Sequence, residues 1–150
     1  MSSVPPPHSP EAISRFLGAL WHFNRTLAKE IEPLLEKELH TDSRSFLLLK
    51  SIQGGLAYPK LLAQEFKIPT TLISRYLDDL TKRGLVERHI DAQDSRRIRL
   101  TLTPAGSALL DETERVVHHH MGHRLARLSA ERLDSLNDAI TALAEEGSPV

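Results

Sequence analysis

The chain has 150 residues, of which 40% are hydrophobic, and its formal net charge is −1 at pH 7. This size predicts one domain, or a small core with helical extensions. The absence of cysteine excludes disulfides, thiolate metal ligands and thiol-based redox sensing. The longest apolar run, residues 46–49, is too short to cross a bilayer, and the N-terminus lacks the pattern of a signal peptide. We therefore expect a cytoplasmic protein without a membrane partner, in which residues 1–8 form a disordered lead.

The positive charge is concentrated in the middle of the chain. Residues 67–99 contain eight Lys or Arg and five Asp or Glu, a net charge of +3, whereas residues 100–150 contain four and eight, a net charge of −4. A locally positive surface is what binding to phosphates requires. The charge of this segment therefore favours a nucleic-acid partner, although the net charge of the whole chain does not.

The first third of the chain predicts two helices. Residues 9–11 (Ser-Pro-Glu) have the pattern of an N-cap, a first helical position and an acid in the first turn. Apolar residues then recur at steps of three and four, and Pro33 is expected to kink or interrupt this helix. Thr41 is expected to cap a second helix over 42–53, which the pair Gly54-Gly55 ends.

The next segment predicts two short helices joined by a tight turn. The first spans 59–66, residues 67–69 form the turn, and the second spans 70–83 with three apolar residues facing inward, namely Ile73, Leu77 and Leu80. Gly84 is the expected left-handed stop. Two helices joined by a three-residue turn form a helix-turn-helix.

A β-hairpin is predicted directly after this helix-turn-helix. Residues 85–90 and 98–102 alternate as strands around a polar tip, which makes the whole segment a winged helix. Thr103 is expected to cap a long helix over 104–127, and Ser129 a last helix. Apolar residues in the last helix form a narrow seam suited to a partner helix: Leu133, Leu136, Ile140 and Leu143.

Several short motifs occur together in residues 62–106: Ser74-Arg75, Leu80, Gly84-Leu85-Val86, Asp94 with Arg96, and Leu102-Thr103-Pro104-Ala105-Gly106. With these motifs the segment resembles the MarR (multiple antibiotic resistance regulator) family of transcription factors. The order of the flanking helices extends the resemblance over most of the chain. One departure is Ser95, where family members usually have Arg or Lys, so the wing tip is less basic here.

The resemblance implies a homodimer in which the first and last helices of two chains intertwine. Two winged helices would then contact successive turns of duplex DNA, typically as a repressor that a small ligand releases. We expect a mainly α fold with a small β-hairpin wing (α+β) and a single unit over residues 9–150. Within it, residues 42–102 would form the winged helix-turn-helix, and residues 9–41 with 103–147 the helical dimerisation part.

The second helix of the helix-turn-helix is expected to present polar residues to DNA, because its apolar residues face the core. Side chains near its N-terminus can reach base edges in the major groove. Arg75 has the forked donor that fits guanine, and hydroxyls bind bases or phosphates. The predicted contacts of this helix are Thr70, Thr71, Ser74 and Arg75. The alternative is an ordinary solvated face on which Arg75 pairs with Asp78 or Asp79.

The hairpin would place an arginine in the minor groove, where negative potential concentrates when the groove is narrow. Arg96 is the first candidate and Arg97 the second, and Asp94 is expected to hold Arg96 in position. The alternative is a solvated tip with a surface salt bridge worth under roughly 1 kcal/mol. Three further cations are predicted to contact phosphates or to serve solubility: Lys82, Arg83 and Arg88.

A row of histidines, residues 118–120 with His123, raises the alternative of a metal-responsive regulator. His119 and His123 stand one turn apart, a spacing able to bind zinc. Zinc-responsive relatives also use acidic and histidine ligands at the start of the second helix. This chain has no matching pair there apart from Asp42, with His40 nearby, and it has no cysteine. Because the set of ligands is incomplete, we predict no metal site. A winged helix that docks proteins, with wing arginines pairing acidic partners, is another alternative.

Trp21, the only tryptophan, is expected in the core or in the dimer interface. In the family that the chain resembles, a crevice beside the dimer-forming helices can hold aromatic or phenolic anions. Trp21, His22 and Arg25 are candidates to line it, and no other cofactor is expected. Carboxylates are scattered over helix faces, and neither a Gly-rich phosphate loop nor a Ser-His-Asp order occurs, so we expect no enzyme.

Overall fold

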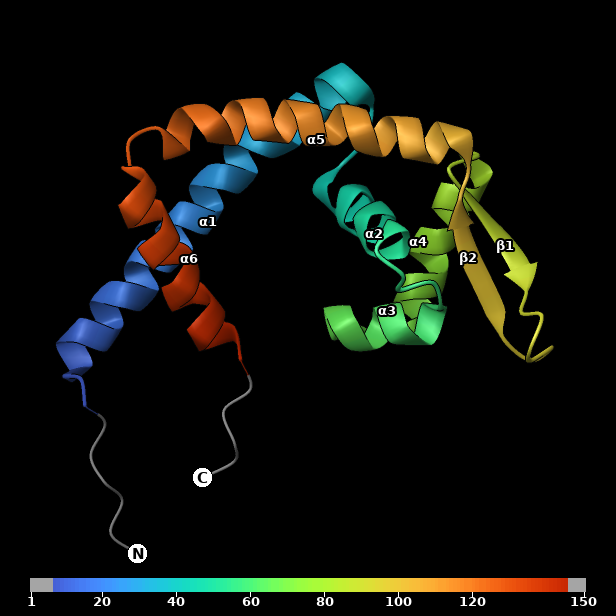
Figure 1. Cartoon of the computed structure of the whole chain (residues 1–150), viewed down its shortest axis with the longest axis horizontal. Coiled ribbons are helices and arrows are strands. Elements are labelled where there is room, and N and C mark those ends of the chain that lie inside the picture. The colour runs from blue at the N-terminus through green and yellow to red at the C-terminus, as the bar shows by residue number, and fades with distance from the viewer. Residues whose placement is uncertain (1–6, 146–150) are drawn as a thin grey trace, which may run out of the picture. The chain divides into compact units, whose positions relative to one another are not determined.

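The computed structural model describes residues 7–145 (Figure 1). Most of the predicted disordered lead and the last two residues of the predicted dimerisation part lie outside this range. The chain divides into two compact units, Met1–Thr113 and Glu114–Val150. Helix α5 (Pro104–Leu125) crosses from the first unit into the second.

Helices and one hairpin make up the described structure, which confirms the predicted fold class. The elements in chain order are α1 (Pro10–Leu39), α2 (Ser43–Gln53), α3 (Pro59–Phe66), α4 (Thr70–Lys82), β1 (Val86–Ile90), β2 (Ile98–Leu102), α5 (Pro104–Leu125) and α6 (Ala130–Ala144). The strands pair antiparallel, with Val86 opposite Leu102 and Ile90 opposite Ile98. A helix-turn-helix followed by this hairpin is the expected winged helix.

Helix α1 begins where the sequence predicts but continues through its internal proline. The Ser9 hydroxyl accepts a hydrogen bond from the Ala12 amide at 3.2 Å, which caps the helix. We expected Pro33 to kink or interrupt this helix; it lies inside the 30-residue helix and does not interrupt it. A proline removes only one backbone donor, and the fully buried Leu35 anchors the turn that follows it.

Helix α2 is capped by a different residue from the one expected. The Asp42 carboxylate accepts a hydrogen bond from the Ser45 amide at 2.7 Å, whereas Thr41 is buried one residue earlier. Aspartate is at least as good an N-cap as threonine, and its position sets the first turn. The expected cap at Thr41 is therefore wrong by one residue, while the predicted end at Gly54 is confirmed.

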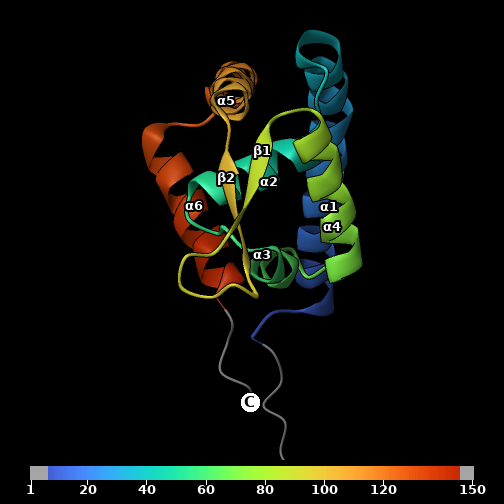
Figure 2. The same cartoon turned by 90° about the vertical axis from the view of Figure 1, so that its right-hand side faces the viewer.

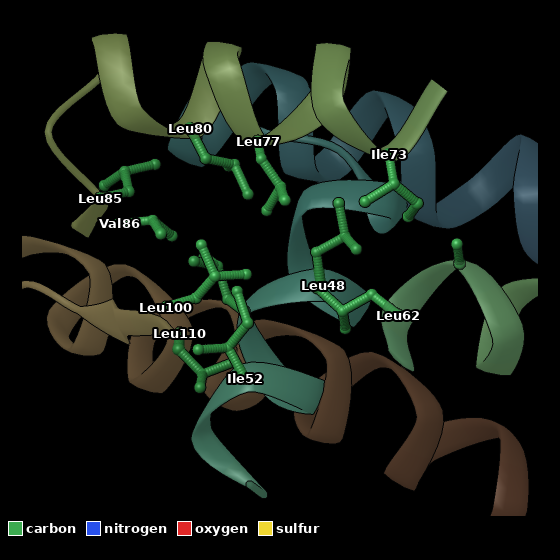
Figure 3. Close-up of a cluster of buried hydrophobic side chains, with 12 residues drawn as sticks. Leu48, Ile52, Leu62, Ile73, Leu77, Leu80, Leu85, Val86, Leu100 and Leu110 are labelled. Carbon is green, nitrogen blue, oxygen red and sulfur yellow. The ribbon is translucent and has the colours of Figure 1, made fainter. Parts of the chain in front are cut away.

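The core of the first unit gathers one apolar face from every element of the winged helix (Figure 3). The predicted inward residues of α4 are confirmed, since Ile73, Leu77 and Leu80 are at most 1% exposed. Leu100 of β2 and Leu110 of α5 close the same cluster. This packing fixes which side of α4 and of the hairpin faces solvent.

Backbone contacts hold the hairpin to the rest of the winged helix. The Leu100 amide donates to the Ala57 carbonyl at 2.7 Å, which ties β2 to the segment before α3. The Thr103 hydroxyl donates to the Gly84 carbonyl at 2.6 Å and accepts from the Gly106 amide at 3.0 Å. Thr103 therefore both caps α5, as predicted, and joins α5 to the turn that ends α4.

The second unit contains the end of α5 and helix α6. Helix α5 ends at Leu125, two residues before its expected end, and the Ser129 hydroxyl caps α6 by accepting from the Arg132 amide at 3.3 Å. No residue of α6 is buried, and three apolar side chains of its predicted seam are exposed: Leu136, Ile140 and Leu143. Among residues 7–145, no helix combines the length and the apolar character that a membrane span needs.

Candidate nucleic-acid interface

Helix α4 presents a polar surface to solvent because its apolar residues fill the core. The side chains predicted to contact bases are all exposed: Thr70, Thr71, Ser74 and Arg75. The N-cap residue is Pro69, which has no side-chain hydrogen-bonding group, and no described side chain caps this helix. The Leu72 amide donates to the Pro69 carbonyl at 3.0 Å, whereas no described group caps the amides of Thr70 and Thr71, and the positive end of the helix dipole favours an anion there.

Arg75 does not form the ion pair that the alternative interpretation requires. Asp78 pairs with Arg88 at 2.7 Å, and Asp79 pairs with Arg83 at 3.6 Å. Within residues 7–145, neither an ion pair nor a side-chain hydrogen bond engages Arg75. Its guanidinium therefore keeps all its donors for a ligand outside the chain.

An open groove lies between the N-terminal half of α4 and the hairpin. It brings together five of the predicted contact residues: Thr70, Ser74, Arg88, Arg96 and Arg97. Figure 2 shows why they meet, since the N-terminal end of α4 and the tip of the hairpin lie at the same end of the winged helix, with α3 between them. Thr71, Arg75 and Lys82 lie on the exposed surface of α4 and do not line this groove, and Asp94 lies in the hairpin loop.

The groove is electropositive. Its charged lining residues are Lys60, Arg88, Arg96 and Arg97, against a single carboxylate, Asp78. Lys60, on the first turn of α3, was not predicted as a contact residue. Its position on the exposed side of a short amphipathic helix was the available signal, but nothing in the sequence showed that α3 borders the hairpin.

Asp94 braces the wing tip through the backbone. Its carboxylate accepts a hydrogen bond from the Arg96 amide at 3.0 Å, and its carbonyl accepts one from the Arg97 amide at 3.0 Å. These bonds form an Asx turn, which fixes the chain without engaging the Arg96 guanidinium. Among the described residues, no ion pair engages that guanidinium, so Arg96 is held by its backbone while its charged group stays available.

Arg97 lies on the face of an aromatic ring. Its guanidinium carbon is 3.8 Å from the centroid of the Tyr58 ring, a cation–π contact. The Tyr58 hydroxyl donates a hydrogen bond to Asp91 Oδ2 at 2.6 Å. This hydrogen bond, followed by desolvation, raises the pKa of Tyr58 above its ordinary 10.0. The same bond, with a second one from the Gln93 amide, lowers the pKa of Asp91 below its ordinary 3.8.

Two of the three cations predicted for phosphates have partners within the protein. Arg88 pairs with Asp78, and Arg83 donates to the His40 carbonyl at 2.9 Å besides pairing with Asp79. Arg83 therefore joins the end of α4 to the end of α1. Lys82 stays exposed on the last turn of α4.

The histidine row and the ligand candidates lie on exposed helix surfaces. The rings of His119 and His123 meet edge to face with centroids 4.7 Å apart. Among residues 7–145, no three His, Asp or Glu side chains gather closely enough to hold a metal ion. Trp21 is 60% exposed, so its expected place in the core of the single chain is wrong. His22 and Arg25 are also exposed on α1.

Comparison with known proteins finds a family model that matches part of the chain and solved structures with the same fold. The MarR family model matches residues 45–97, which span α2 to the hairpin tip. The transcriptional regulator BldR from Sulfolobus solfataricus has the same fold, with a TM-score of 0.76, 23% identity, and alignment over 90% of this chain and 99% of that one.

The similar structures include complexes with DNA. A cysteine-to-serine mutant of MarR from E. coli, complexed with operator DNA, matches with a TM-score of 0.74 and 23% identity over 91% of this chain and 99% of that one. The S. aureus MepR–DNA complex matches with a TM-score of 0.72 and 20% identity over 85% and 94%. The MarR family model thus matches the winged helix of this chain, and the chain shares the fold of these structures.

Proposed function

We propose that this protein is a sequence-specific regulator of transcription that binds double-stranded DNA as a homodimer on a pseudo-palindromic operator. The observation that carries the proposal is the electropositive groove in which Thr70 and Ser74 of α4 face Arg96 of the hairpin. One helix end and one arginine-tipped ribbon, held by a common core, can enter neighbouring major and minor grooves of DNA. The DNA complexes of MarR and MepR, which share the fold, support the same use of this surface.

In this proposal the contacts divide by chemistry. The first turns of α4 enter the major groove, where Arg75 donates two hydrogen bonds to guanine and the hydroxyls of Thr71 and Ser74 bind bases or phosphates. Arg96 enters the minor groove. Lys60 and Lys82 bind phosphates, which fixes the register of the protein and makes its affinity depend on salt.

Exposed apolar side chains support the homodimer. On α1, Phe16 is 49% and Trp21 60% exposed, and on α6, Leu143 is 68% exposed. Large apolar residues at helical spacing cost free energy when they stay in water, and burial against a second copy removes that cost. A dimer presents two winged helices to half-sites about one helical turn apart.

Release by a small ligand completes the proposal. A regulator of this kind acts as a repressor that an aromatic or phenolic anion detaches from DNA, and Trp21, His22 and Arg25 offer a ring and cationic groups for such an anion. Their exposure on α1 is compatible with a site completed by a second copy. Among the described residues, no three possible metal ligands lie close together, so nothing there supports the metal-responsive alternative.

Selection of bound duplexes from a random library tests the function. We expect recovery of a palindromic sequence and a steep loss of affinity between roughly 50 and 200 mM salt, with the sequence preference retained. In the same assay, Arg75→Ala should relax the preference at one base pair of each half-site, at a cost of about 1–3 kcal/mol. A protein that is monomeric at micromolar concentration, or that binds every duplex equally, would overturn the proposal.

A further inference from the structure

We infer that Tyr58 is a positioning residue of the DNA-binding wing. It holds the hairpin loop, residues 91–97, in one conformation by engaging Asp91 and Arg97 at the two ends of that loop. The inference rests on the proposed DNA-binding function and adds to it a residue outside the hairpin that sets the wing.

Tyr58 lies at the N-cap of α3, and the rigid Pro59 follows it. Its position is therefore fixed by the helix-turn-helix and not by the hairpin. From there, its hydroxyl donates to Asp91 Oδ2 at 2.6 Å while its ring face lies 3.8 Å from the guanidinium carbon of Arg97. One side chain thus engages both ends of the loop with different chemical groups.

The loop itself depends on the same carboxylate. Asp91 Oδ1 accepts a hydrogen bond from the Gln93 amide at 2.8 Å, so the oxygen atoms of one carboxylate bind Tyr58 and the first turn of the loop separately. The Asp91 amide donates to the Arg97 carbonyl at 3.0 Å, which closes the loop at its base. A change in the Tyr58–Asp91 contact therefore reaches the backbone of the whole loop.

The consequence for DNA binding falls on Arg96, next to Arg97. Because Arg97 is stacked on Tyr58 and Asp94 holds the Arg96 amide, the backbone from which Arg96 projects is set from both sides. A loop that is already ordered in the free protein does not have to lose further conformational entropy when it binds DNA. The contact therefore adds to the affinity for the preferred site without an additional contact to DNA.

A pair of variants tests this inference on the free energy of DNA binding. Tyr58→Phe keeps the ring and its stacking on Arg97 but removes the hydroxyl, and Asp91→Ala removes the acceptor. We expect Tyr58→Phe to weaken binding to a duplex selected by the wild-type protein about fivefold, with affinity for a scrambled duplex unchanged, and Asp91→Ala to reduce the preference for the selected over the scrambled duplex at least as much. The double variant should be no weaker than Asp91→Ala alone, because Asp91→Ala already removes the hydrogen bond that Tyr58→Phe removes.

The matched control is Tyr76→Phe. Tyr76 is the only other tyrosine, and its ring also lies under an arginine, with the guanidinium carbon of Arg44 4.2 Å from its centroid. This control makes the same chemical change away from the hairpin and should bind the selected duplex like the wild type. Equal weakening by Tyr58→Phe on both duplexes, with a lower melting temperature, would show a general structural role and overturn the inference.

A second measurement uses the free protein and does not depend on DNA. Alkaline titration of phenolate absorbance should show Tyr58 ionising above 10.0, and Asp91→Ala should remove that shift. Absence of the shift in the wild type, or wild-type affinity of Tyr58→Phe for the selected duplex, would overturn the positioning role alone. If the wild type selects no duplex at all, the proposed function fails, and the titration still reports whether the contact forms.

Discussion

Asp78 of α4 and Arg88 of β1 form an ion pair across the groove, with 2.7 Å between the carboxylate oxygen and the guanidinium nitrogen. The sequence predicts that Arg88 contacts phosphates or serves solubility, whereas in the structure the Asp78 carboxylate of α4 holds it. Both side chains are partly exposed, at 55% and 33%, so the pair is worth less than about 1 kcal/mol to folding. Its main effect is on the charge of the groove, because the Asp78 carboxylate neutralises the positive charge of Arg88.

Asp78→Asn should therefore strengthen DNA binding. The substitution releases the Arg88 guanidinium and removes the only carboxylate that lines the groove. We expect tighter binding and a plot of log affinity against log salt that steepens by about one unit, as for one added phosphate contact. Asp79→Asn is the matched control, because it makes the same charge change beside Asp78 but releases Arg83, and its effect should be smaller. Unchanged or weaker binding by Asp78→Asn would contradict this assignment.

Arg96→Ala should weaken binding to the selected duplex about tenfold to a hundredfold while leaving the dimer intact. The reason is that the Arg96 guanidinium lines the groove without an ion-pair partner among residues 7–145, whereas the Arg97 guanidinium already lies on Tyr58. Gel-shift titration at fixed salt measures the affinity, and sedimentation measures the oligomeric state.

Arg99→Ala is the control for the wing arginine. Arg99 of β2 lies opposite His89 in the strand register and on the other face of the hairpin from the buried Leu100, and it does not line the groove. The substitution therefore removes the same charge from the hairpin away from the groove. A loss as large for Arg99→Ala as for Arg96→Ala would show that only overall charge matters.

Local patterns were sufficient to predict the elements. Ile73, Leu77 and Leu80 could be placed in the core because a three-and-four spacing leaves one face of a helix apolar. Helix ends could also be predicted, because a capping residue interacts only with backbone within one or two turns of itself. The predicted roles at helix ends are confirmed for Ser9, Ser129 and Gly84. The error at Thr41 has the same origin, since two adjacent residues were both suitable caps and only tertiary packing decides between them.

Contacts between distant segments could not be predicted in the same way. Tyr58 meets Asp91 across 33 positions, and Arg83 meets His40 across 43. Nothing in the local spacing of a tyrosine before a proline indicates which carboxylate it will meet. The sequence was therefore sufficient to identify the residue types of the candidate interface. Only the structure shows which arginines are paired within the protein and which are available to a ligand.

Gly106→Ala should destabilise the first unit by about 1–3 kcal/mol. A Cβ at this position would fall on the carbonyl oxygen of Leu85, far inside van der Waals contact, and backbone cannot move aside as a flexible side chain can. This close approach explains the glycine that ends the motif of residues 102–106, since α5 starts directly against the turn after α4. Chemical denaturation followed by circular dichroism measures the change.

Gly122→Ala is the control in the same helix. No atom lies within 4 Å of a Cβ at this position, so alanine should stabilise α5 by about 0.5–1 kcal/mol through its higher helix propensity. Opposite signs for the two substitutions would separate the steric effect from propensity. Stabilisation by Gly106→Ala would contradict the close approach.

Ile140→Lys should shift the protein from dimer to monomer and abolish binding to the palindromic duplex. Ile140 is 53% exposed at the centre of the α6 seam, and burial of an unpaired ammonium group in an apolar interface costs several kcal/mol. In the proposed homodimer each winged helix contacts one half-site, so loss of the dimer would also remove the gain that two linked sites provide. Asp138→Lys, which changes the charge more but lies on the opposite side of α6, should remain dimeric. Analytical ultracentrifugation at micromolar concentration distinguishes the two, and a dimeric Ile140→Lys variant would exclude the α6 seam from the interface.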